Sequence, residues 1–148
     1  MTGGRLSLSE IRDRIAANST VAATTGIKVG SALDADYFDA FTQSFPAIWV
    51  VGQRTTPLDP GDKYSSQFRQ STQCEVAVRV LVKRFIDGDF NRESELNALS
   101  NAASAALLGW QPTGSAKPFS WGASQDGEPS NTVMVVDLVF KTEVVYQQ

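Results

Sequence analysis

The feature that most constrains the fold is a long valine-rich stretch, residues 73–86, in which apolar and more polar side chains alternate. Such period-two alternation is typical of a β-strand with one face in a hydrophobic core and the other face partly in water. The predicted core face comprises Cys74, Val76, Val78, Val80 and Val82, and the opposite face comprises Glu75, Ala77, Arg79, Leu81 and Lys83. The stretch therefore predicts a strand that another element of the chain covers on one side.

A helical pattern follows this strand after a polar turn at residues 87–91. Its apolar residues lie on one stripe at helical spacing: Leu96, Leu99, Ala103, Ala106 and Leu107. Gly109 is expected to end the helix as a left-handed cap, and Pro112 prevents its continuation. We therefore predict a helix over residues 92–108 that folds back onto the strand. Trp110 is expected to pack on the last helical turn, and an exposed ligand platform is the alternative.

The first helix is marked by a capping box at residues 7–10. The Ser7 hydroxyl and the Glu10 carboxylate are expected to accept hydrogen bonds from free backbone amides in a reciprocal pair. Leu6 and Ile11 have the spacing of a hydrophobic staple, which fixes the angle at which the chain enters the helix. This pattern predicts a helix that ends near Asn18.

The next two segments have weaker patterns. Residues 19–30 are rich in small residues and threonine, which predicts an irregular connection with a short strand at residues 27–29. Residues 34–45 carry aromatic side chains at roughly helical spacing behind Asp34, which can cap a helix. We expect a second helix there.

Two further strands complete the predicted sheet. Residues 46–52 are apolar on both faces, which is typical of a short central strand, and Pro46 is tolerated at its first position. Residues 132–146 alternate over a length of about 50 Å, so this strand is expected to bend, bulge or extend beyond its own sheet. The predicted core of the three strands comprises Val76, Val78, Val80, Ile48, Val50, Val136, Leu138 and Phe140.

Two long polar stretches, residues 53–72 and 111–131, are predicted to be loops because turn-forming residues recur in them. Their aromatic residues either fold back onto the domain or contact a partner, and we favour the partner. Arg79 stands beside Glu75 on the wetter face of its strand, and belongs either to an interface pair or to a solvated row. The candidate interface residues are therefore Tyr64, Phe68, Arg69, Arg79, Phe119 and Trp121.

The residues expected at a catalytic or cofactor site are missing. The chain has no histidine, and its one cysteine lies in the middle of a strand on the apolar face. Residues 87–91 have oxygen-bearing side chains at the spacing of a calcium loop. Arg92 and Ala98 replace the glycine and the glutamate that such a loop needs, so a turn and helix cap are favoured. We expect no enzymatic activity, no metal and no cofactor.

Composition limits the remaining classes. A chain of 148 residues fits one domain, residues 1–148, and the 42% apolar and 20% charged residues are typical of a globular protein. A net charge of −3 without basic blocks disfavours nucleic-acid wrapping and membrane-surface binding. No run approaches the roughly 20 apolar residues of a membrane span, and the first residues lack the apolar region of a signal peptide. We expect a protein made in a cytoplasm.

In this order of elements the chain resembles the tail terminator proteins of tailed bacteriophages. The resemblance covers most of the chain: an N-terminal amphipathic helix, a Pro-Ala-x-x-Val stretch, a long valine-rich strand, and a helix ending in Leu-Gly-Trp-x-Pro. The two sharpest pieces are Phe-Pro-Ala-Ile-Trp-Val-Val at residues 45–51 and Ala-Leu-Leu-Gly-Trp-Gln-Pro at residues 106–112.

The resemblance implies a fold, an assembly and a set of partners. The fold would be α+β: a single domain with a mainly antiparallel sheet, two or three flanking helices and long loops. The assembly would be a ring, usually of six copies, that stops polymerisation of the tail tube at its head-proximal end. Its partners would be the tube protein, the head–tail connector or neck and, in contractile tails, the sheath, with genomic DNA passing through the lumen. The protein would be assembled in the bacterial cytoplasm and end in the virion.

Two other classes stay open at this point. One is a different neck or tail component, such as a head-completion or tube-like protein. The other is an enzyme that uses only carboxylates, serine, lysine or tyrosine. A deep pocket with paired carboxylates would favour the enzyme, whereas a flat surface with several contact sides would favour the ring.

Overall fold

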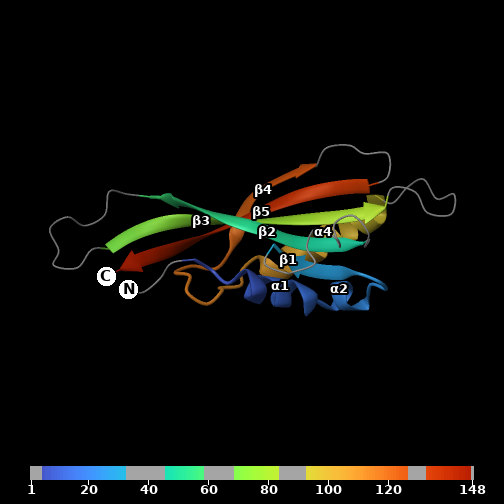
Figure 1. Ribbon diagram of the computed structural model, residues 1–148, viewed down its shortest axis with the longest axis horizontal. Coiled ribbons are helices and arrows are strands. Elements are labelled where there is room, and N and C mark those ends of the chain that lie inside the picture. Colours follow the sequence, from blue (N-terminus) through green and yellow to red (C-terminus); the bar gives the residue numbers. More distant parts are fainter. Residues whose placement is uncertain (1–4, 33–45, 59–68, 84–92, 127–132, 148) are drawn as a thin grey trace.

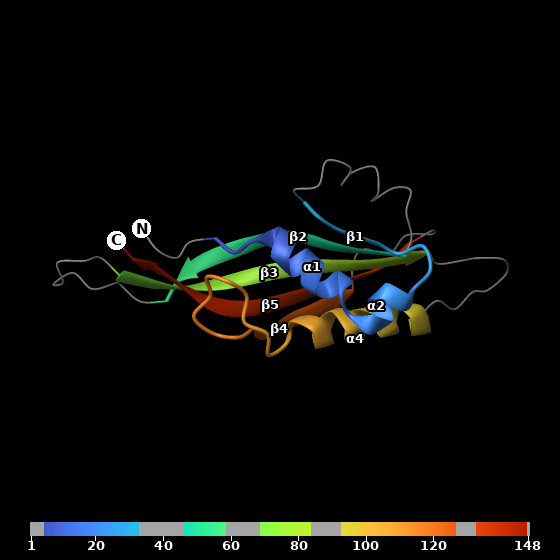
Figure 2. The same ribbon diagram turned by 90° about the horizontal axis from the view of Figure 1, so that it is seen from below.

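The computed structural model describes residues 5–32, 46–58, 69–83, 93–126 and 133–147. In this part of the chain five strands form one sheet in the order β1-β2-β3-β5-β4, and three helices lie on one side of it (Figures 1 and 2). The strands are β1 (Lys28–Ser31), β2 (Ala47–Pro57), β3 (Arg69–Lys83), β4 (Ser120–Asp126) and β5 (Val133–Gln147). The helices are α1 (Leu8–Ala16), α2 (Ser19–Ala23) and α4 (Glu93–Leu107). β1 and β2 are parallel, and the other three strand pairs of this sheet are antiparallel. A mainly antiparallel sheet covered by helices is an α+β fold, so the predicted class is confirmed.

The centre of the sheet is the antiparallel pair β3–β5. The two strands have 15 residues each and pair along their whole length, from Arg69 opposite Gln147 to Lys83 opposite Val133. The expected length of the last strand is confirmed. It is accommodated by a neighbour of equal length rather than by a departure from the sheet. The expected alternation is confirmed from Thr72 to Val80, where alternate residues are buried. Leu81 was expected on the partly wet face, but it is buried in a second apolar cluster with Ala47 and Trp49.

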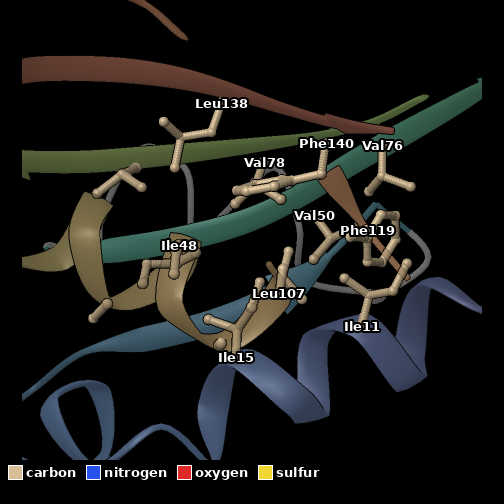
Figure 3. Close-up of a cluster of buried hydrophobic side chains, with 14 of the residues drawn as sticks. Ile11, Ile15, Ile48, Val50, Val76, Val78, Leu107, Phe119, Leu138 and Phe140 are labelled. Carbon is tan, nitrogen blue, oxygen red and sulfur yellow. The ribbon is translucent and has the colours of Figure 1, made fainter. Parts of the chain in front are cut away.

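The hydrophobic core lies between this sheet and the helices (Figure 3). The sheet contributes Phe140 at its centre, and α1 and α4 contribute fully buried side chains such as Ile11, Ile15 and Leu107. All eight core residues predicted from the strand patterns are buried here: Val76, Val78, Val80, Ile48, Val50, Val136, Leu138 and Phe140. The helix predicted at residues 92–108 is α4, and it packs on β3 and β5.

The capping of α1 follows the prediction on one side only. The Ser7 hydroxyl accepts from the Glu10 backbone N–H at 3.2 Å, and Leu6 and Ile11 are both buried. The Glu10 carboxylate was expected to turn back to the cap. Instead it accepts from the backbone N–H and the hydroxyl of Thr113, at 3.1 and 3.0 Å, and so ties α1 to the segment after α4.

Three segments predicted as irregular contain regular structure, so these predictions were wrong in part. Residues 53–57 and 69–72 of the first expected loop extend β2 and β3, which remain paired up to Pro57 opposite Thr72. The second expected loop contains β4. Residues 19–30 include α2, which was not expected and whose first turn is capped by the Asn18 side chain. The short strand expected at residues 27–29 is confirmed as the start of β1. The unexpected strand residues of β2, β3 and β4 pair through their backbones, which a search for apolar alternation does not detect.

Two further predictions concern parts of the chain that the structure does not describe. The helix expected at residues 34–45 lies outside the described residues. So does the turn and cap expected at residues 87–91.

The core assignment makes a direct prediction for stability. Val78 is fully buried at the centre of β3, so Val78→Asp places a charge in the core without a partner. We expect a loss of several kcal/mol from a typical total of about 5–15 kcal/mol, measured by chemical unfolding. Gln73→Asp is the control, because Gln73 lies on the opposite face of the same strand and is partly exposed. Equal stability of the two variants would contradict the assignment of the strand faces.

Candidate interaction surface

Among the helices and strands that the structure describes, β4 is the most exposed, at one edge of the sheet. It pairs with β5 on one side, and every one of its seven residues is exposed. The strand has few apolar residues, and its sequence, Ser-Trp-Gly-Ala-Ser-Gln-Asp, has neither proline nor lysine. Native proteins commonly protect free strand edges with such residues, since an unprotected edge invites pairing with another chain. β4 is therefore a candidate contact site.

A bulge at Gly122 shapes this edge. The register of β4 against β5 shifts between Trp121 and Ala123, so Gly122 is an extra residue opposite β5. A Cβ atom at Gly122 would lie 2.8 Å from the Val139 carbonyl oxygen, closer than real Cβ atoms come. Glycine is therefore required for the close approach of the two backbones at this point.

Trp121 is the large apolar side chain of this edge. Its ring meets Phe140 edge-on, with ring centroids 5.6 Å apart and an interplanar angle of 87°. This edge-to-face arrangement is a favoured aromatic geometry, so the contact with Phe140 fixes the orientation of the Trp121 ring. The residue nevertheless remains 44% exposed. Trp121 is thus a positioned aromatic residue with a free surface, as the sequence-based interface prediction requires.

Phe119 has a different position. It is 3% exposed and packs between Trp110 and Phe140, with ring centroids 6.2 and 6.4 Å away. Its backbone N–H donates to the Trp110 carbonyl and its carbonyl accepts from Gly109 N–H, so it fastens β4 to the end of α4. For Phe119 the fold-back alternative therefore holds, and its side chain is not part of the exposed surface (Figure 3).

Trp110 also belongs to the body of the domain. Gly109 has φ +79°, the left-handed conformation expected of the helix cap, and Trp110 N–H donates to the Leu107 carbonyl. The Trp110 ring packs against the core, and the Arg14 guanidinium lies 5.4 Å from its centroid. The expectation that Trp110 packs on the last helical turn is borne out.

Arg79 pairs on the outer face of the sheet, although not with Glu75. Its Nε lies 2.7 Å from a carboxylate oxygen of Asp137, the residue directly opposite on β5. Glu75 accepts from the Gln73 side chain instead. Both charges of the Arg79–Asp137 pair are about one third exposed, so the pair adds little to stability. It does neutralise this part of the outer face.

A second exposed edge is the end of β2. β1 pairs with residues 47–50 only, so the rest of β2 has β3 on one side and no strand of the described sheet on the other. Residues 54–58 are all exposed, and Leu58 is 46% exposed. Of the remaining candidates, Arg69 begins β3, and its side chain is not described. Tyr64 and Phe68 lie outside the described residues.

The described residues offer little for catalysis. Burial raises the pKa of the Cys74 thiol, which disfavours the reactive thiolate. No cluster of metal-ligating side chains occurs within the described ranges. One surface hollow beside β4 is lined by Glu143 with Lys117 and Lys141, and a second between α1 and α4 has no acidic residue in its lining. No described helix is long and apolar enough to cross a membrane.

Comparison with known proteins identifies the family to which the chain belongs. The family model "Phage tail terminator protein" matches residues 1–148. The chain belongs to the phage tail terminator family. It is therefore a structural protein of the phage tail.

A solved structure has the same fold. It is a chain of the "Virion of native gene transfer agent (GTA) particle", with a TM-score of 0.66 at 14% sequence identity. The match covers 95% of this chain and 96% of the other. A comparison with curated protein sequences finds no match. The resemblance seen in the sequence of this terminator is thus confirmed at the level of the family and of the fold.

The bulge predicts a specific effect of mutation at the β4 edge. Gly122→Ala should lower stability by about 1–3 kcal/mol, because the added methyl group overlaps the Val139 carbonyl. Gly52→Ala is the matched control. It also lies beside a register shift, but a Cβ there meets nothing within 4 Å. Thermal unfolding of both variants tests this, and a Gly122→Ala protein as stable as the Gly52→Ala protein would contradict the described bulge.

Proposed function

We propose that this protein caps the head-proximal end of the tail tube as a ring of six copies, in the manner of its family, and so ends tube polymerisation. The observation that carries the proposal is the family match, which extends over residues 1–148. The ring would also form the surface that joins the tail to the head or neck.

The surface of the described residues is compatible with this role. A ring subunit needs contact regions on opposite sides, and this sheet has one exposed edge at β4 and another along the end of β2. The outer face carries charges that pair within the chain, such as Arg79 with Asp137. Lys117 and Glu143 form a further pair beside β4. A self-neutralised face suits a channel through which a polyanion must pass without being held.

The proposed partners follow from the role. One side of the ring would contact the tail tube protein and the other the head–tail connector or neck, with the sheath added if the tail is contractile. Genomic DNA would pass through the lumen without specific binding. The ring would be assembled in the host cytoplasm and remain in the finished virion. A different neck or tail component is the alternative, and it differs in which structure the protein binds.

The length of tails tests the proposal. In phage lysates that lack this protein, we expect tubes of uncontrolled length that fail to join heads. Addition of the purified protein should restore uniform tails, because a capped end adds no further tube subunits. Electron microscopy of negatively stained lysates measures both effects. Tails of normal length but without heads would instead favour a neck component that acts after termination.

A further inference from the structure

The two exposed edges of the sheet complement each other across a ring. One is β4, and the other is the outer edge of residues 53–58 at the end of β2, which we call the β2 end. Neither edge has a neighbouring strand in the described sheet, and residues 54–58 and 120–126 are all exposed. At the start of the β2 end, the half-buried Gln53 side chain is hydrogen-bonded to the Leu6 backbone. Each edge therefore leaves backbone groups that another strand can bind.

The direction of the strands fits this contact. β2 is antiparallel to β3, β3 to β5, and β5 to β4, so β2 and β4 run in opposite directions within one chain. Rotation about a ring axis preserves each strand's direction along that axis. The β4 of one copy would therefore meet the β2 end of the next copy as an antiparallel pair, the geometry already used on its other side.

The two faces of the sheet select a register for this pair. In a ring the helix-covered face of each copy stays on the same side, so residues that become opposite must share a face. Thr55 and Ser124 both lie on the helix-covered face, since they align with Cys74 and Leu138. Arg54 and Gln125 both lie on the outer face, aligned with Glu75 and Asp137.

In this register the bulge aligns Trp121 of β4 with Pro57 of the β2 end. If Ser124 faces Thr55, Ala123 faces Thr56, and the extra residue Gly122 leaves Trp121 opposite Pro57. Both of these residues also lie on the helix-covered face, as Trp121 aligns with Phe140 and Pro57 with Thr72. Seven residues of β4 with one bulge therefore match the six residues of the β2 end.

The exposed apolar residues support the same match. The large apolar side chains most exposed in the described part of the chain are Leu58, Leu108 and Trp121. Two of the three stand on these two edges, and the register places Leu58 beside the start of β4. Pro57 has no N–H, so at this position the edge offers a carbonyl acceptor but no backbone donor, and the Trp121 contact would involve mainly side chains.

From these observations we infer that neighbouring copies of this protein join edge to edge, with β4 of one copy added to the β2 end of the next, so that the sheets form one closed ring. The inference rests on the proposed function in that it takes a ring of copies as given. Closure requires the strands to tilt against the ring axis, as they do in barrels, because β4 and the β2 end overlap only in part along the sheet.

A pair of cysteines tests the register directly. The variant Thr55→Cys, Ser124→Cys is made in a Cys74→Ser background, so that no other thiol is present. Under mild oxidation of the assembled protein, we expect disulfide-linked species that increase in steps up to the mass of the ring and return to monomer on reduction. The control pair Thr55→Cys, Ala98→Cys places its second thiol on the exposed surface of α4 and should give no such series.

A second variant tests the side-chain contact. Trp121→Ala should raise the protein concentration needed for half-assembly about tenfold or more, since buried tryptophans are frequent hot spots. Leu108→Ala is the control: its side chain is similarly exposed, but it lies at the end of α4, beside Phe119 and outside the paired residues of β4. Sedimentation velocity measures the assembly, and circular dichroism confirms that both variants are folded.

The outcomes separate this inference from the proposed function. Rings that cap tubes but give no cross-links, cross-links that stop at dimers, or cross-links to the tube protein would each overturn the edge-to-edge contact and leave the capping role intact. A parent protein that neither forms rings nor limits tail length would remove the proposed function itself. An equal effect of Trp121→Ala and Leu108→Ala on assembly would also count against the inference.

Discussion

The unbroken pairing of β3 with β5 is the constraint on which the rest of this structure depends. Fifteen residues of each strand are joined by backbone hydrogen bonds, and alternate side chains on one face form the floor of the core. The helices occupy only part of this length, because α4 has 15 residues and rises about 1.5 Å per residue, whereas a strand rises about 3.3 Å. The sheet therefore extends beyond its helical cover, as Figure 2 shows. The exposed end of β2 lies in that extension.

The part of the fold that depends on burial could be predicted from the sequence. The alternation of Val76, Val78 and Val80 specified the core face of β3, and Gly109 specified the end of α4. The ends of β2 and β3 could not be predicted in this way. Residues 53–57 lack an apolar pattern, and they form strand because β3 continues beside them and offers backbone partners. β4 is the same case, since all its side chains are exposed and no apolar pattern marks it.

Only part of the candidate surface could be predicted from the sequence, for a similar reason. Phe119 and Trp121 stand two residues apart in one polar stretch, and nothing in their sequence context separates them. In the structure Phe119 lies under the end of α4 and is buried, while Trp121 lies beyond that cover and keeps a free surface. The contact of Glu10 with Thr113 was likewise invisible, because it joins residues 103 positions apart. The family, in contrast, was recognisable from short motifs, and the whole-chain match confirms it.

The central claim is that copies of this terminator close a ring on the tail tube through the edges of their sheets. A cryo-electron microscopy reconstruction of the head-proximal tail end tests this claim most directly. The account predicts one ring of this protein at the end of the tube, with β4 of each copy one strand spacing, about 4.8 Å, from the β2 end of its neighbour. A ring in which β4 faces solvent or a different protein would contradict the edge-to-edge account. A tube end without this protein would contradict the capping role as well.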